Sequence, residues 1–200
     1  MTQSAATIQP PLGGADDLTA QIAKGRSMID AGDAEGSIPV LEDAVASALE
    51  SSRPHTAAIA RIALALGLEA AGDPTKASVE ARGAAQVFEH YGDIGRAARA
   101  YSVAALVSSQ AGDLASTVED LPRAILLIRD AGPDAPLVPA LMNVGLALAE
   151  LGGFDQAMPY LFRARALAQA GGDGNDLANA RTNLAFVEER WAARLRLAGR

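Results

Sequence analysis

The chain has no cysteine, and only 4% of its 200 residues are aromatic. The lack of cysteine excludes disulfides, thiolate metal sites and a cysteine nucleophile. Basic residues are in the minority, because 17 Lys and Arg stand against 24 Asp and Glu, for a net charge of -7. A broad basic surface for nucleic acid is therefore disfavoured, since phosphate contacts need Lys and Arg. With few aromatic residues, the core must be built mainly from Ala, Leu, Val and Ile.

Targeting signals and long apolar runs are also missing. Residues 1–12 contain no Lys or Arg and no apolar run, which differs from a secretory signal peptide. No stretch of about 18 apolar residues is free of charged and turn residues, so the sequence predicts no membrane span. We therefore expect a soluble cytoplasmic protein with neither a membrane nor a nucleic acid as its partner.

Glycine, by contrast, recurs at a fixed spacing. It occupies seven of the eight positions that lie 20 residues apart from 32 to 172, and Ser52 is the exception. The seven are Gly32, Gly72, Gly92, Gly112, Gly132, Gly152 and Gly172. Five of them are followed by Asp. Glycine supplies the positive φ that ends a helix, and the Asp side chain caps the next helix. The spacing therefore predicts a series of helices joined by short turns.

The intervals between these turns have helical spacing. Ile59, Ile62 and Leu66 fall on one stripe, and no segment shows the alternation of a strand. Pro122 lies deep inside one interval and is expected to kink that helix or to delay its start. The expected helices are 16–31, 34–51, 54–71, 74–91, 93–111, 114–131, 135–151, 154–171 and 175–197.

Positions 40 residues apart are more alike than positions 20 apart. One such column reads Ala44, Ala84, Ala124 and Ala164, and another reads Gly25, Ala65, Ala105 and Gly145. Small residues at fixed places let two helices approach closely. The repeating unit is therefore a pair of helices.

Residues 140–157, ALMNVGLALAELGGFDQA, followed by Leu161 and Ala164, resemble a full tetratricopeptide repeat (TPR). The period of 40 is similar to the long-helix TPRs of kinesin light chains and of bacterial peptide-receptor regulators. The resemblance implies an all-α, right-handed superhelical solenoid over residues 16–200. Its repeats would cover about 16–53, 54–92, 93–133 and 134–173, with a capping helix at 174–198.

The two ends differ from the repeats. Residues 1–15, with Pro10-Pro11 and Gly13-Gly14, are predicted to be a flexible arm. The last helix carries the only Trp, Trp191. Its side chain either covers the end of the solenoid or, with Leu195 and Leu197, forms an interface with another domain, a further repeat or a second copy of the chain.

Catalytic patterns are weak. His55 and His90 have no His partner at the spacing of a metal site, and surface or capping roles are expected. The glycine-rich segment 171–176 lacks the ligand pattern of a calcium loop and the Lys of a phosphate loop, so it is interpreted as a turn. We expect no catalytic residue, no metal, no cofactor and no enzymatic activity.

In TPR proteins the first helix of each pair lines a concave groove. One column of those helices reads Ala23, Ala63, Val103, Asn143 and Asn183. The amide of an Asn both donates and accepts, so Asn143 and Asn183 would hold the backbone of an extended peptide, as Asn does in long-repeat TPR families. In the alternative, the two Asn side chains bond neighbouring helix ends or water.

Further groove candidates are Arg26, Arg99, Ser102, Gln110, Asn179 and Glu150. Arg26 and Arg99 would meet an acidic group of a ligand. Chaperone-binding TPRs use a clamp of Lys and Asn side chains. This sequence has Ile22 and Arg26 at the matching places, so that clamp is not expected.

Two functions remain open at this stage. The favoured one is a non-catalytic module or scaffold that binds a protein or peptide segment in its groove. The alternative is an N-terminal sensory or oligomerisation domain of a larger bacterial signalling protein, such as a diguanylate cyclase or a transcriptional regulator, with its output domain beyond residue 200. A homodimer through the C-terminal helix is one form of this alternative. The net charge of -6 over residues 16–50 and +3 over residues 181–200 also favours head-to-tail attraction.

Overall fold

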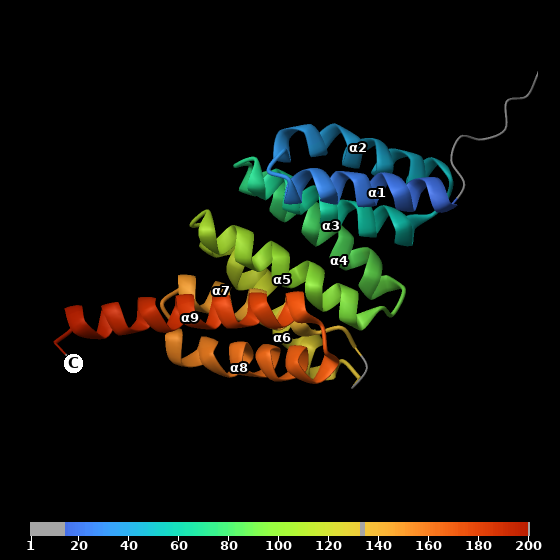
Figure 1. Ribbon diagram of the computed structural model, residues 1–200. Helices are drawn as coiled ribbons and strands as arrows, with labels where there is room; N and C mark the ends of the chain where they lie inside the picture. The colour runs from blue at the N-terminus through green and yellow to red at the C-terminus, as the bar shows by residue number, and fades with distance from the viewer. Residues whose placement is uncertain (1–14, 133–134, 200) are drawn as a thin grey trace, which may run out of the picture.

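The computed structural model of the protein describes residues 15–132 and 135–199. These residues form nine α-helices and no strand, arranged as an array of helix pairs (Figure 1). The helices are α1 Ala15–Asp30, α2 Ala34–Glu50, α3 Pro54–Ala70, α4 Pro74–His90, α5 Ile94–Gln110, α6 Leu114–Asp130, α7 Val138–Glu150, α8 Phe154–Gly171 and α9 Gly174–Leu197. The predicted arm lies outside the described residues, except for Ala15, which belongs to α1.

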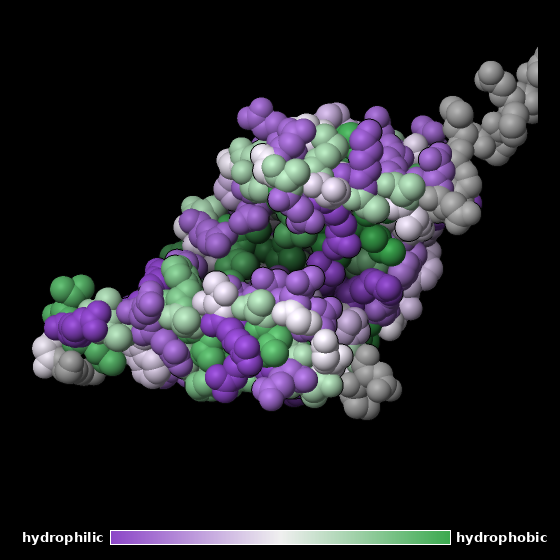
Figure 2. Space-filling model, in the orientation of Figure 1, coloured by the Kyte–Doolittle hydropathy of each residue, from purple (hydrophilic) through white to green (hydrophobic). Residues whose placement is uncertain are grey.

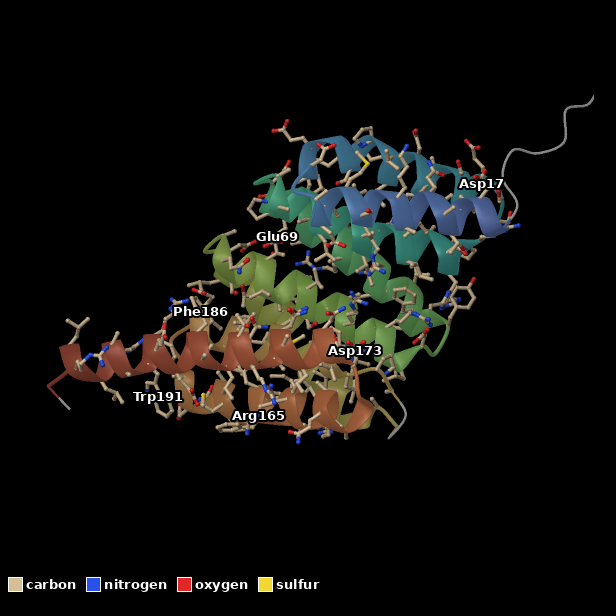
Figure 3. The ribbon with its side chains drawn as sticks, viewed as in Figure 1. Asp17, Glu69, Arg165, Asp173, Phe186 and Trp191 are labelled. Carbon is tan, nitrogen blue, oxygen red and sulfur yellow. The ribbon has the colours of Figure 1, made fainter. Side chains whose placement is uncertain are left out.

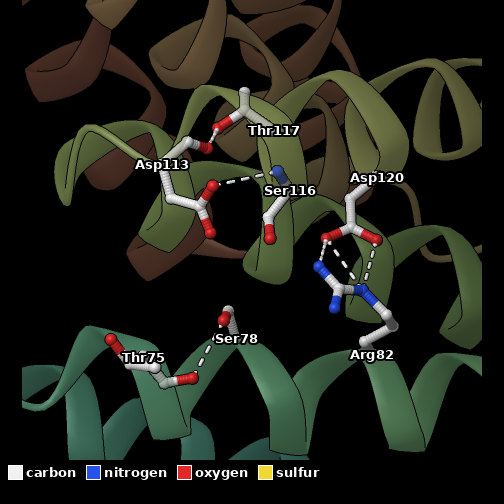
Figure 4. Close-up of polar contacts among 7 residues, drawn as sticks. All are labelled: Thr75, Ser78, Arg82, Asp113, Ser116, Thr117 and Asp120. Atoms are coloured by element: carbon white, nitrogen blue, oxygen red, sulfur yellow. Dashed lines mark hydrogen bonds and ion pairs between the residues drawn. The ribbon is translucent and has the colours of Figure 1, made fainter.

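The Gly-Asp turns form as predicted. Gly72 ends α3 with a φ of 85°, and the Asp73 carboxylate then accepts a hydrogen bond of 3.1 Å from the Lys76 amide. Asp113 caps α6 in the same way through the Ser116 amide at 3.1 Å (Figure 4). These contacts satisfy amide groups that the first turn of a helix leaves without a partner.

Ser52, where the glycine series is interrupted, adopts the same turn as the glycines. Its φ is 55°, in the left-handed region that L-residues other than glycine rarely occupy. The turn between α2 and α3 is therefore imposed by the packing of the two helices.

Gly132 differs from the other glycines of the series. It has no positive φ, and the helix expected from residue 135 begins only at Val138. The sequence supplies the reason, because Pro133 follows Gly132 and a proline drives the residue before it towards an extended conformation. The predicted Gly-type turn is wrong at this one place, and α7 is shorter than the other helices.

Pro122 does not delay the start of its helix. α6 begins at Leu114 and runs through Pro122 to Asp130. A proline removes the amide that would bond the carbonyl four residues earlier, which here belongs to Val118. Val118 is exposed, so water can take the place of that amide. The expected delay is therefore wrong.

The small-residue columns serve close packing within each pair. A Cβ added to Gly25 would lie 2.5 Å from Cγ of Leu41, and one added to Gly145 would lie 2.6 Å from Cγ of Leu161. A side chain at either place would clash with the facing leucine unless that leucine or the helix moved. The predicted close approach of the first helix to the second is thus confirmed in the first and fourth pairs.

The odd-numbered helices α1, α3, α5, α7 and α9 also contact one another along the array, but unevenly. α5 and α7 pack closely, whereas α3 and α5 touch only slightly. We call the α5–α7 contact the closed junction and the α3–α5 contact the open junction. The open junction divides the layer of odd-numbered helices, and Figure 1 shows α1 and α3 on one side of it and α5 and α9 on the other.

On the side of the even-numbered helices, the same two repeats are held together by an ion pair. The Arg82 guanidinium of α4 donates to both carboxylate oxygens of Asp120 in α6, at 2.9 Å from Nε and 2.7 Å from Nη2 (Figure 4). Asp120 is only 1% exposed, so this bidentate pair compensates a buried charge. Repeats two and three thus pack together mainly through α4 and α5, with the Arg82–Asp120 pair as a further link between α4 and α6, while α3 and α5 diverge.

Candidate functional site: a pocket at the open junction

A cavity of about 210 Å³ lies at the open junction. Residues of four helices line this central pocket: Arg26, Ile59, Ile62, Phe88, Arg96 and Arg99. Figure 2 shows this part of the surface as a hollow with hydrophobic residues inside and hydrophilic residues around its rim. The pocket exists because α3 and α5 diverge and leave α4 as its floor.

The floor of the pocket is apolar and firmly packed. Phe88 is fully buried, and Ile62 is buried beside it. The His55 ring packs edge-on against Phe88, with 5.1 Å between ring centroids, and its Nε2 lies 3.2 Å from Asp93 Oδ2. His55 therefore packs behind the pocket wall that Phe88 forms.

The rim of the pocket is basic. Arg96 forms an ion pair of 2.6 Å with Asp93. Neither Arg26 nor Arg99 has an ion-pair partner among the described residues. Burial lowers the pKa of Arg99, and the positive charge of Arg26 lowers that pKa further. The carboxylate of Asp176 raises it, by less than Arg26 lowers it, so positive charge dominates around Arg99.

A second cavity, of about 270 Å³, adjoins the first along α1. Thr19, Ile22, Ala23, Arg26, Thr56 and Ile59 line it, so Arg26 and Ile59 belong to both cavities. The two cavities therefore lie next to each other, and we call them together the groove between α1, α3 and α5. The surface of the second cavity is mainly apolar.

Two predicted groove residues instead join α5 to α7. Asn143 Nδ2 donates to Ser102 Oγ at 3.2 Å, and Ser102 Oγ donates to the Arg99 carbonyl at 2.7 Å. Ser102 is fully buried, so it lies beneath the groove surface and orients Asn143. Asn143 is half-buried, and this bond uses only one of its amide hydrogens.

The other candidates lie apart from the central pocket. Gln110 is exposed at the last residue of α5, about 16 Å along the helix from Arg99. Asn179 is exposed and Asn183 half-buried on α9. Glu150 forms an ion pair with Arg190. Of the predicted set, the structure brings Arg26 and Arg99 into one pocket and links Asn143 through Ser102 to the backbone of Arg99.

Four pocket residues were absent from the predicted set. Ile59 and Ile62 were interpreted as a packing stripe, and their role in the pocket follows from the separation of α3 from α5, which the sequence does not show. Phe88 belongs to an even-numbered helix and was not expected in the groove. Arg96 could have been predicted as a pocket residue from the sequence, because it precedes Arg99 by three residues and therefore lies on the same face of the helix.

The C-terminal half of α9 extends beyond α7 and α8 (Figure 1). Trp191 lies on the side of α9 that faces α8 and packs against the core (Figure 3). It borders a cavity of about 410 Å³ together with Phe154, Arg194 and Leu195. Leu197, one turn from the end of the described chain, is 91% exposed.

Metal and membrane features are absent from the residues that the structure describes. No group of three or more His, Asp or Glu side chains there is arranged to hold a metal ion. None of the described helices has the length and apolar character needed to cross a bilayer.

Comparison with known proteins identifies the fold. No family model and no curated protein sequence matches the chain. Among the solved structures that resemble it are two of the nearly identical TPR-like repeats of a putative kinesin light chain from Podosopora anserina, one of them a substituted variant. Each has a TM-score of 0.61, is 15% identical and covers 90% of this chain, with 89% and 88% of the other chain covered. The predicted all-α solenoid of TPR type is confirmed.

Proposed function

We propose that the protein is a non-catalytic binding module that holds an extended segment of another protein in the groove between α1, α3 and α5. The TPR-like fold supports a protein-interaction or scaffold role in general. The observation that carries the specific proposal is the open junction, because it forms a pocket in which apolar side chains lie beside Arg26 and Arg99, which have no ion-pair partner among the described residues.

The two asparagines extend this proposal along the solenoid. Asn143 and Asn183 occupy matching places on α7 and α9, one repeat apart. The hydrogen bond with Ser102 holds the Asn143 amide in one orientation while its carbonyl and second N–H remain available to a peptide backbone. A pre-oriented amide loses less side-chain entropy on binding than a mobile one.

A selection from displayed random peptides of about twelve residues, which span about 40 Å when extended, tests the proposal. Peptides selected on the wild-type protein should lose affinity for an Asn143→Ala/Asn183→Ala variant of unchanged helicity. An Asn175→Ala variant, altered in the first turn of α9, is the matched control. Equal binding to all three proteins would exclude a role for the two asparagines, and failure to select any peptide would count against the groove itself.

The alternative, an assembly or sensory domain, is favoured by one observation on α9. Gly25, Ala65, Ala105 and Gly145 are all buried under the even-numbered helix that follows them, but their counterpart Ala185 is exposed. α9 thus presents a packing surface with no helix on it in the described chain. An Ala185→Glu substitution would block a helix from docking there.

Light scattering after gel filtration tests this second candidate. A dimeric wild type that becomes monomeric on Ala185→Glu substitution would support assembly through α9. A wild type that is monomeric over a wide concentration range would count against self-assembly through this surface.

A further inference from the structure

The central pocket concentrates positive charge in a protein whose net charge is -7. Of its three arginines, only Arg96 has an ion-pair partner, Asp93. Arg26 of α1 and Arg99 of α5 carry two charges that no described carboxylate neutralises within ion-pair distance. Their mutual repulsion is evident at Arg99, because the charge of Arg26 lowers the pKa of the Arg99 guanidinium. An anion between the two side chains would relieve this repulsion.

The arrangement also limits which anion fits. Arg26 and Arg99 border the same cavity of about 210 Å³, so their charges act at one place rather than at two separate subsites. A single carboxylate would neutralise only one of them. A phosphate monoester carries a charge of about -1.5 to -2 at neutral pH and offers three acceptor oxygens to the planar guanidinium groups. A compact dianion therefore matches the two unpaired arginines.

The rest of the lining indicates what carries the phosphate. Ile59, Ile62 and Phe88 form an apolar wall next to the arginines, and Ile59 continues into the apolar groove along α1. Phe88 and Ile62 are almost fully buried, so the apolar surface that a phosphate alone would leave uncovered belongs mainly to Ile59. A phosphorylated side chain followed by an apolar residue would cover both parts of the pocket.

We propose that the central pocket binds a phosphorylated serine or threonine of the segment held in the groove, with Arg26 and Arg99 contacting the phosphate and an adjacent apolar side chain lying on Ile59 and Ile62. This inference rests on the proposed function and names the residue that the groove recognises. Asn143 and Asn183 would hold the backbone, and the arginines would select the modified side chain.

Three bead-bound peptide libraries test the inference. They share degenerate flanking positions and differ only in a fixed central residue, which is phosphoserine, serine or glutamate. The wild-type protein should be retained at least about tenfold better on the phosphoserine library, because each charge-assisted bond to a phosphate oxygen is strong in a partly buried site. Equal retention on phosphoserine and glutamate would overturn the choice of phosphate and indicate an acidic segment instead.

Substitutions locate the binding at the pocket. Arg99→Gln and Arg26→Gln should each remove most of the preference for phosphoserine. Arg26 is exposed, so its loss should change stability little, and the fold of both variants is checked by circular dichroism. Arg163→Gln, which removes an exposed charge from α8, is the matched control and should bind as the wild type does. A preference that survives both pocket substitutions would overturn the inference.

Two further outcomes separate this inference from the proposed function. If all three libraries are retained alike and the Asn143→Ala/Asn183→Ala variant loses them all, the phosphate inference fails while the proposed function stands. Free O-phosphoserine and a soluble phosphoserine peptide are compared, at the same concentration, as competitors of the phosphoserine library. If both compete equally well, the pocket is a small-molecule site and the peptide part of the inference fails. Absence of retention on every library would overturn the inference, and the random-peptide selection then judges the proposed function independently.

Discussion

The open and closed junctions are built from corresponding positions of successive repeats, yet one forms a pocket and the other a packed contact. Ile62 of α3 and Val103 of α5 belong to the open junction. The corresponding positions of the closed junction, one repeat later, are Ser102 of α5 and Asn143 of α7. Ser102 and Asn143 join α5 to α7 through a hydrogen bond of 3.2 Å. Two apolar side chains of larger volume stand at the corresponding places of α3 and α5, and the distance between packed helices depends on the side chains between them.

The ends of the two junctions differ in the same sense. His55 at the start of α3 corresponds to Gly95 at the start of α5. A Cβ added to Gly95 would lie 3.0 Å from Cδ of Pro136, so the absence of a side chain is what admits the segment before α7. At the open junction the His55 ring fills the corresponding space and contacts Phe88 and Asp93. A few side-chain volumes thus decide which junction of a regular repeat opens into a pocket.

The largest expected effect comes from Ser102→Ile, which gives the closed junction the residue that the open junction has at the corresponding place, Ile62. Ser102→Ile adds volume at a fully buried position and breaks the bond to Asn143, so it should lower the free energy of unfolding by about 3 kcal/mol. Urea denaturation measures the change. Ser102→Ala removes only the hydrogen bond and should cost about 1 kcal/mol. Equal costs for the two variants would show that side-chain volume does not set the α5–α7 distance.

A smaller effect is expected at the ion pair that closes the open junction on its other side. Asp120→Ala leaves Arg82 without its carboxylate and should lower the free energy of unfolding by about 2 kcal/mol, less than for a fully buried pair because Arg82 is 23% exposed. The corresponding residue in α4, Glu80, lies 3.6 Å from Arg61 in a pair that is about one-third exposed. Glu80→Ala should therefore change stability by less than about 0.5 kcal/mol. Thermal or urea unfolding of both variants gives the comparison, and a cost for Glu80→Ala as large as that for Asp120→Ala would contradict it.

Substitutions in the turns should change stability less than Asp120→Ala does, and they separate stability from binding at the pocket. Ser52→Gly removes the strain of a non-glycine residue in the left-handed region, and it also makes the unfolded chain more flexible, which partly offsets the gain. The free energy of unfolding should therefore rise by about 0.5–1 kcal/mol. The reverse change at an equivalent turn, Gly72→Ser, should lower it by a similar amount. Neither turn borders the central pocket, so peptide affinity should stay at the wild-type value in both variants. A gain in stability from both substitutions would show that the sign of φ does not control these turns.

The local elements could be predicted from the sequence with few errors. The helix boundaries follow from Gly, Asp and Pro at regular intervals, and each of these residues acts on its own neighbours in the chain. The two errors in the turns and helices have local causes as well, since Pro133 changes the turn at Gly132 and α6 continues through Pro122 at a place where Val118, four residues earlier, is exposed. The candidate site was predicted only in part. Arg26 and Arg99 share a pocket, but Ser102 lies beneath the groove and Gln110 is far from it.

The sequence by itself therefore determined the repeat, the helix pairs and the TPR-like fold, because these depend on residues close together in the chain and on a periodic pattern of small side chains. Only the tertiary structure decided where the layer of odd-numbered helices opens. That choice depends on the side chains at the two junctions, which are Ile62 and Val103 at one and Ser102 and Asn143 at the other, and on the Arg82–Asp120 pair. The two members of each of these pairs lie about 40 residues apart in the chain. Whether such residues meet depends on the distance between two helices, which results from all the side chains packed between them.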